Sequence, residues 1–186
     1  MKFFALGFAL NLAIASPAPA ANWTMRPGQS VLGFSGTQTG APFHGTFTQW
    51  TAQIGFDPTN PQAAHVKFSI ETASAKTGDT QRDTALPDSD WFDVEAFPQA
   101  VFEATGFTPE GGDKYQTAGA LTIRGISQKV DLPFTLVITG NRAEAKGEIL
   151  LLRTAYGVGQ GNWSSGDWVG LTAGVTFDLV AMKTGS

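Results

Sequence analysis

The sequence predicts an all-β protein in which about eight antiparallel strands form a barrel or a sandwich, with one long crossover between two of them. Three observations support this prediction. The chain is rich in glycine and phenylalanine, with 22 and 14 of its 186 residues, as in proteins of strands and tight turns. Apolar and polar side chains alternate with a period of two in several segments. Most links between these segments are short and contain turn-forming residues.

The strand pattern recurs in eight segments. The clearest is 64–71, where Ala64, Val66, Phe68 and Ile70 alternate with polar or charged residues. One face of each segment is apolar and has to be buried, so the strands must pack as two sheets or close on themselves. In order along the chain the segments are 30–36, 43–56, 64–71, 100–107, 115–123, 130–139, 143–153 and 171–179.

Residues 77–107 interrupt the series of hairpins. The polar part, 78–96, contains cap residues at Asp79-Thr80 and Pro87–Asp90, which predict two short helical turns. Pro98 then ends this excursion, and the chain returns to an extended strand. The aromatic side chains of Trp91 and Phe92 suit a crossover that covers one end of the barrel as a lid.

The first 20 residues predict a secretory signal peptide. Lys2 precedes an apolar run, and Ala18-Pro19-Ala20 matches a cleavage site, so we expect residues 21–186 to remain as one domain. The chain has no cysteine, which fits the bacterial periplasm better than a disulfide-rich secretion. A formal net charge of −4 gives no support for a nucleic-acid partner.

No motif predicts an enzyme, a cofactor or a metal site. His44 and His65 have no neighbours in the sequence that would complete a zinc or nucleophile site. Arg82, Arg124 and Arg153 each lie at the end of an apolar segment. There a guanidinium can meet solvent or the anionic group of a ligand.

A series of short phrases, in this order, resembles the signatures of the YceI-like family and spans about residues 25–181. They are Gly45-Thr46-Phe47, Ile54–Pro58, Ala73–Gly78 with Arg82-Asp83, Ser89–Asp93, Phe97–Phe102, Gly119–Gly125 and Leu152–Gly159. The resemblance implies an exported, lipocalin-like, eight-stranded antiparallel barrel whose lumen binds a long amphiphile. The implied ligand is a polyisoprenoid, such as a quinone or a polyprenyl phosphate, or a fatty-acid derivative.

The expected ligand contacts fall into two groups. At the mouth of the barrel we expect Trp91, Phe92, Arg82 and Arg153. In the lumen we expect the inward-facing residues Phe34, Trp50, Phe68, Ile70, Phe102, Leu121, Ile123, Phe134, Leu136, Val175 and Phe177.

Two other functions fit the same pattern. A barrel with a solid core would serve as a periplasmic interaction or stress module without a ligand, and an outer-membrane β-barrel would show the same alternation turned inside out. Some family members are fused to, or encoded beside, a cytochrome b561-like membrane protein, which makes such a protein a candidate partner. The sequence leaves the oligomeric state open, a dimer included.

Overall fold

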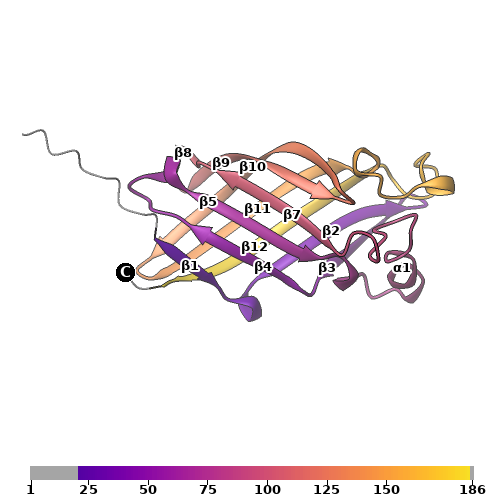
Figure 1. Ribbon diagram of the computed structural model, residues 1–186, viewed down its shortest axis with the longest axis horizontal. Helices are drawn as coiled ribbons and strands as arrows, with labels where there is room; N and C mark the ends of the chain where they lie inside the picture. Colours follow the sequence, from indigo (N-terminus) through magenta and orange to yellow (C-terminus); the bar gives the residue numbers. More distant parts are fainter. Residues whose placement is uncertain (1–20, 185–186) are drawn as a thin grey trace, which may run out of the picture.

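Twelve β-strands form one antiparallel sheet in the computed structural model, which describes residues 21–184 (Figure 1). The strands are β1 (Asn22–Met25), β2 (Val31–Gln38), β3 (Ala41–Phe47), β4 (Trp50–Gly55), β5 (His65–Glu71), β6 (Ala75–Lys76), β7 (Gln99–Thr105), β8 (Thr108–Gly111), β9 (Lys114–Ile123), β10 (Ile126–Thr139), β11 (Arg142–Leu152) and β12 (Thr172–Lys183). The helices are α1 (Thr80–Ala85) and the 3₁₀ turns η1 (Pro27–Gln29), η2 (Pro61–Ala63), η3 (Thr72–Ser74), η4 (Arg153–Tyr156) and η5 (Gly161–Trp163).

These strands occupy eight positions around a closed ring. β1 and β2 both pair with β12, so together they fill one position, and β3 and β4, which pair with β2 and β1, fill the next. β5, β7, β9, β10, β11 and β12 follow in that order, and the pairing of β1 with β12 closes the ring. The predicted eight-stranded antiparallel barrel is confirmed, although the sequence pattern missed the short strands β1, β6 and β8. The predicted signal peptide, residues 1–20, lies outside the described residues.

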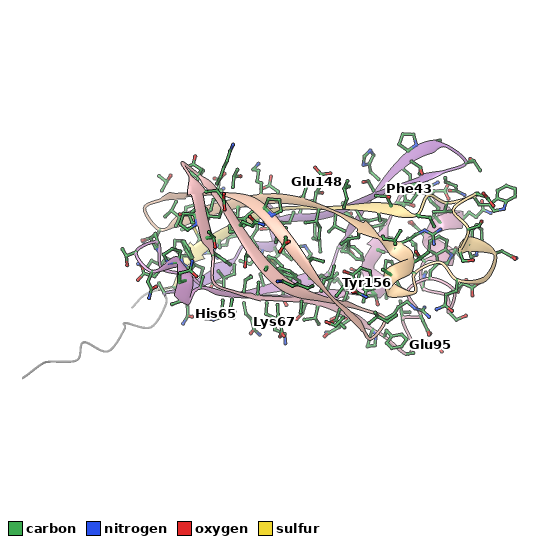
Figure 2. The ribbon with its side chains drawn as sticks, turned by 90° about the horizontal axis from the view of Figure 1, so that it is seen from above. Phe43, His65, Lys67, Glu95, Glu148 and Tyr156 are labelled. Atoms are coloured by element: carbon green, nitrogen blue, oxygen red, sulfur yellow. The ribbon has the colours of Figure 1, made fainter. Side chains whose placement is uncertain are left out.

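Alternation separates the lumen from the outer surface. On β11, Ala143, Ala145 and Leu151 are buried, whereas the intervening Glu144 and Lys146 are exposed. Ion pairs lie on the outside, among them Lys67 with Glu103 at 2.6 Å and Lys146 with Asp178 at 2.7 Å. Figure 2 shows His65, Lys67 and Glu148 on this outer surface. The apolar core of the protein is therefore the inside of the barrel.

Two inward-facing glycines make room for phenylalanine rings. A Cβ atom on Gly119 would lie 2.5 Å from Cε2 of Phe102, and one on Gly147 would lie 2.5 Å from Cε1 of Phe177. Each ring therefore occupies the space beside the strand that a larger residue would fill. The two glycines thus let the rings of Phe102 and Phe177 lie close to the neighbouring strand.

The crossover begins as the sequence predicts. Asp79 caps α1, because its Oδ1 accepts a hydrogen bond from the backbone N–H of Arg82 at 3.0 Å. The second predicted helical turn is wrong: residues 86–96 form consecutive turns, in which the backbone N–H groups of Trp91 and Asp93 both donate to the carbonyl of Asp88 at 2.9 Å. Asp93 has a φ of 50°, which ends any helical path. Proline, aspartate and serine favour such turns as well as helix starts.

None of the helices that the structure describes has the length and apolar content needed to span a bilayer. Figure 1 shows α1 at one end of the barrel, together with the loop that joins β11 to β12, whereas the C-terminal end of the chain lies at the other end. We call the end with α1 the mouth and the opposite end the floor.

Replacing Trp23 with alanine tests the closure of the ring. Trp23 is buried on β1, and its Nε1–H donates to the carbonyl of Phe56 at 3.0 Å. The variant should lose about 3–5 kcal/mol of unfolding free energy in urea titration, because a cavity forms and that carbonyl loses its donor. Thr24→Ala, on the exposed side of the same strand, should change it by less than about 0.5 kcal/mol. Equal effects would contradict the role of Trp23.

Candidate functional site

The lumen contains two spaces. The larger, which we call the upper chamber, lies toward the mouth and has a volume of about 170 Å³, and the smaller lower chamber has about 60 Å³. A buried water needs only about 10–15 Å³ of such space, so the upper chamber can hold a substantial organic group. Phe68, Leu132 and Phe177 line both chambers and separate them.

All eleven residues expected in the lumen lie in its wall. Nine line the upper chamber: Phe34, Trp50, Phe68, Ile70, Phe102, Leu121, Ile123, Val175 and Phe177. Phe134 and Leu136 line the lower chamber. Their placement follows from the alternation of each strand, and their contact with a ligand stays a prediction.

Polar side chains are few in the upper chamber and lie mainly toward the mouth. They are Ser35, Arg153, Tyr156 and Thr172. Burial raises the pKa of the Tyr156 hydroxyl, which is therefore protonated at neutral pH and can donate a hydrogen bond. The chamber is thus a largely apolar container with polar groups near one end, an arrangement that suits an amphiphile.

Two irregular segments cover the mouth. The crossover contributes Trp91 and Phe92, as predicted, and also Leu86 to the wall of the upper chamber. The second segment, the 153–171 loop, is fastened to the crossover because the backbone N–H groups of Gly159 and Gln160 both donate to the carbonyl of Asp90 at 2.8 Å. We call the two segments together the lid.

Apart from Arg153, which the sequence places at the mouth, the 153–171 loop is the part of the lid that sequence reasoning missed. It contributes Tyr156, Val158 and Val169 to the upper chamber. Figure 2 shows Tyr156, together with Phe43 of β3, toward this end of the barrel. Neither periodicity nor a helix signal marks these loop residues. Other missed lining residues on strands, among them Phe47, Ile149 and Leu151, do lie in phase with the alternation.

Arg153 differs from the solvated or ligand-binding arginine that the sequence predicts. Only 5% of the residue is exposed, and no carboxylate of the described residues forms an ion pair with it. Burial lowers the pKa of its guanidinium. The five N–H groups donate to backbone carbonyls in the lid: Gly170 at 2.9 Å, Val158 at 2.8 Å, Gly159 at 3.2 Å, Val169 at 2.8 Å, and Trp163.

These bonds use the full donor capacity of the guanidinium, so Arg153 has no N–H group free for a ligand. The residue lines the upper chamber, but its structural task is to hold the 153–171 loop in shape. Its guanidinium also lies over the ring of Trp91, with Cζ 5.5 Å from the ring centroid. Arg153 therefore connects both segments of the lid.

Arg82 does not line either chamber. Its Nη1 donates to Oε1 of Gln38 at 3.0 Å, and its guanidinium lies 4.9 Å from the ring centroid of Phe43. Instead Arg124 anchors the crossover: it donates to the carbonyls of Ser89 and Trp91 at 2.7 Å. The prediction that Arg82 contacts a ligand at the mouth finds no support in this geometry.

Trp91 contains the one buried side-chain polar atom without a hydrogen-bond partner in the described part of the chain, its indole Nε1. Such an unsatisfied donor typically costs about 1–3 kcal/mol. Trp91 lines the upper chamber and packs against Trp163, with ring centroids 5.6 Å apart. Its N–H is thus a donor in the lid that no group of the described residues satisfies. Within residues 21–184, no group of three or more histidine, cysteine, aspartate or glutamate side chains is placed to hold a metal ion.

Comparison with known proteins agrees with this geometry. A model of the YceI-like domain family matches residues 23–181. UPF0312 protein plu2095 of Photorhabdus laumondii is 36% identical over 129 residues, which are 68% of this chain and 67% of the relative. The crystal structure of BcnA from Burkholderia cenocepacia has a TM-score of 0.82 at 31% identity and covers 85% of this chain and 99% of that one.

A polyisoprenoid binding domain from Saccharophagus degradans, described as implicated in plant cell wall breakdown, has a TM-score of 0.70 at 14% identity. The match covers 88% of this chain and 99% of that domain. At this identity the likeness is one of fold. The family match and the solved structures together confirm the YceI-like resemblance and the barrel.

Arg153→Lys tests the structural role of the buried guanidinium. A lysine has three donors in place of five and leaves lid carbonyls unpaired, so the unfolding free energy should fall by about 2–4 kcal/mol. Desolvation lowers the pKa of a buried amine, so the unfolded variant binds more protons than the folded one. The stability of the variant should therefore rise with pH up to the ordinary lysine pKa of about 10.4.

The measurement is urea unfolding of both proteins across neutral to alkaline pH. Wild type should lack this rise, because arginine stays protonated in both states. Arg142→Lys, at a partly exposed arginine paired with Glu144 at 2.8 Å, is the control and should behave like wild type. A neutral effect of Arg153→Lys would overturn the role assigned to Arg153.

Proposed function

Since the chain belongs to the YceI-like domain family, we propose that it is an exported periplasmic binding protein that holds a long amphiphile in its lumen. The ligand class is a polyisoprenoid, such as a quinone or a polyprenyl phosphate, or a fatty-acid derivative. The protein carries, stores or senses this molecule and catalyses no reaction. The observation that carries the proposal is the apolar upper chamber of about 170 Å³ beneath a lid with polar groups.

Burial of the tail supplies the main part of the binding free energy. Apolar area contributes roughly 25 cal/mol per Å², so a tail that buries several hundred square ångströms gains more than a single polar contact supplies. Most of the lining consists of aliphatic and aromatic side chains. Selectivity then depends more on the length and shape of the tail than on specific hydrogen bonds.

The head group belongs at the mouth. Ser35, Tyr156 and Thr172 are there, and the unpaired Nε1–H of Trp91 lies in the lid. The charge of Arg153 has no carboxylate partner in the described residues, so it favours an anionic or carbonyl head group without a direct bond. A phosphate and a quinone carbonyl both offer the acceptor that these groups require.

The geometry favours this function over the two alternatives. A solid-core module would have its lumen filled by side chains, whereas two chambers are open here. An outer-membrane barrel has a polar interior and an apolar outer band. In this protein the lumen is apolar, and ion pairs such as Lys67 with Glu103 lie outside. A cytochrome b561-like membrane protein is the predicted partner, and it would exchange the ligand at the mouth.

The direct test is to purify the mature protein from the periplasm without detergent and to compare native with denaturing mass spectrometry. We expect about one isoprenoid or acyl species for each chain, released on denaturation. A protein that is empty and also fails to take up added ubiquinone or polyprenyl phosphate would favour the solid-core module. Recovery only from the cytoplasm, with the first 20 residues still attached, would contradict export.

Trp91→Asp tests the lid. A carboxylate at this apolar position has to be desolvated against the tail, so lipid retention should fall by about tenfold or more while the barrel stays folded. Trp91→Phe is the matched control, since it keeps an aromatic ring and removes only the larger indole with its N–H. For both variants, the measurement is the amount of lipid bound per chain after gel filtration. Circular dichroism checks that each variant is folded. Unchanged retention in Trp91→Asp would exclude a lid role.

A further inference from the structure

Two aromatic rings divide the lumen between the chambers. Phe68 of β5 and Phe177 of β12 line both chambers, and their ring centroids are 5.9 Å apart, a contact distance for aromatic pairs. β5 and β12 are not neighbours in the sheet, so the pair spans the lumen rather than following its wall. We call these two side chains the crossbar.

The crossbar lies about halfway along the barrel. Phe177 is the sixth of the twelve residues of β12, and Phe68 is the fourth of the seven residues of β5. A strand of twelve residues rises about 40 Å, and with a tilt of about 40° it gives a lumen about 30 Å long. The crossbar therefore leaves about 15 Å of lumen on each side.

Buried aromatic side chains lie at the floor end of the lower chamber. Trp23, Phe56 and Phe107 line it, and each of them is buried. The rings of Phe56 and Phe107 stack with centroids 5.5 Å apart, and the Nε1–H of Trp23 donates to the carbonyl of Phe56. A tail that enters from the mouth therefore has to pass the crossbar to reach the lower chamber.

The lower chamber offers nothing to a polar group. Thr117 is the one polar side chain among its lining residues, and its hydroxyl already donates to the carbonyl of Gly106 at 2.8 Å. The rest of its lining is aliphatic or aromatic. Its ligand chemistry is that of a hydrocarbon end, such as the last isoprene units of a tail.

Each ring of the crossbar has a different support. Phe68 stacks on Phe102, with centroids 6.1 Å apart, and packs edge-on to Trp50 at 5.8 Å. Phe177 lies beside Gly147, where a Cβ atom would come within 2.5 Å of its Cε1. The absence of a side chain at Gly147 thus determines how far Phe177 can stand back from the axis of the lumen.

We propose that the crossbar is a length filter and that the lower chamber is a separate subsite for the end of a long hydrocarbon tail. A short amphiphile fills the upper chamber alone. A longer one that enters from the mouth reaches the lower chamber by parting Phe68 and Phe177 beside Leu132, so its affinity does not rise steadily with tail length. This inference rests on the proposed function, because it presumes a tail in the upper chamber.

The test measures the Kd values of geraniol, farnesol and geranylgeraniol, prenols that differ by single isoprene units, with the purified, delipidated protein. For wild type, affinity should increase from geraniol to farnesol and then change by less than about threefold to geranylgeraniol. Phe177→Ala removes one ring of the crossbar, so this variant should bind geranylgeraniol about tenfold or more tightly than farnesol. Phe177→Leu should give an intermediate gain if the alanine variant does not fold.

Leu179→Ala is the matched control. Leu179 is buried two residues further along the same strand and lines only the lower chamber, so the variant enlarges that chamber but keeps the crossbar. As in wild type, its affinity should therefore change by less than about threefold from farnesol to geranylgeraniol. At Gly147→Ala the new Cβ atom would meet the ring of Phe177 at 2.5 Å and the backbone carbonyl of Pro133 at 2.9 Å. In a folded variant it should push the ring toward Phe68, weaken geranylgeraniol binding and leave geraniol binding nearly unchanged.

The outcomes separate this inference from the proposed function. Wild type that binds the prenols with a steady gain for each unit, or a Phe177→Ala protein with the wild-type profile, would overturn the length filter and leave lumen binding intact. Wild type that binds none of the prenols, nor ubiquinone, would overturn both. A thermal unfolding transition has to be measured for every variant to check that its barrel is folded.

Discussion

Closure of the sheet is the constraint on which the rest of the structure depends. Eight strand positions fix the circumference, and alternation sends every second side chain into the same narrow lumen. The volume of those side chains then decides between a solid core and a container. On β11, Ala145 and Gly147 lie opposite Leu179 and Phe177 of β12, and this mixture of small and large residues leaves the chambers open.

The lid is held together differently from the barrel, because its irregular backbone does not form the regular hydrogen bonds of a sheet. Its carbonyls would be left unpaired without Arg153 and Arg124, which donate to them from the ends of β11 and β9. A guanidinium offers five donors in a fixed fork, whereas a lysine offers three from a single nitrogen atom. Arg153 and Arg124 therefore serve mainly to hold the irregular segments of the lid in place. Their effect on a ligand is secondary and electrostatic.

The strands and the inward-facing residues could be predicted from the sequence because a period of two is a local property. Phe68 and Phe177 were placed correctly in this way. The turns after Pro87 and the lining residues Tyr156 and Val158 could not be predicted, since these two segments are held by bonds between groups far apart in the sequence, such as Arg124 with Ser89 and Gly159 with Asp90. The division of the lumen into two chambers could not be predicted from the sequence either, because no sequence pattern indicates which rings meet across a barrel.

The contact between the first and last strands also has a kinetic consequence. Trp23 lies opposite Lys183, so the ring cannot close until almost the whole chain is available. Long-range pairings of this kind slow folding, and until closure both edges of the sheet expose unpaired backbone groups. Until the last strand is in place, the apolar inner face of the sheet therefore has no closed lumen to cover it.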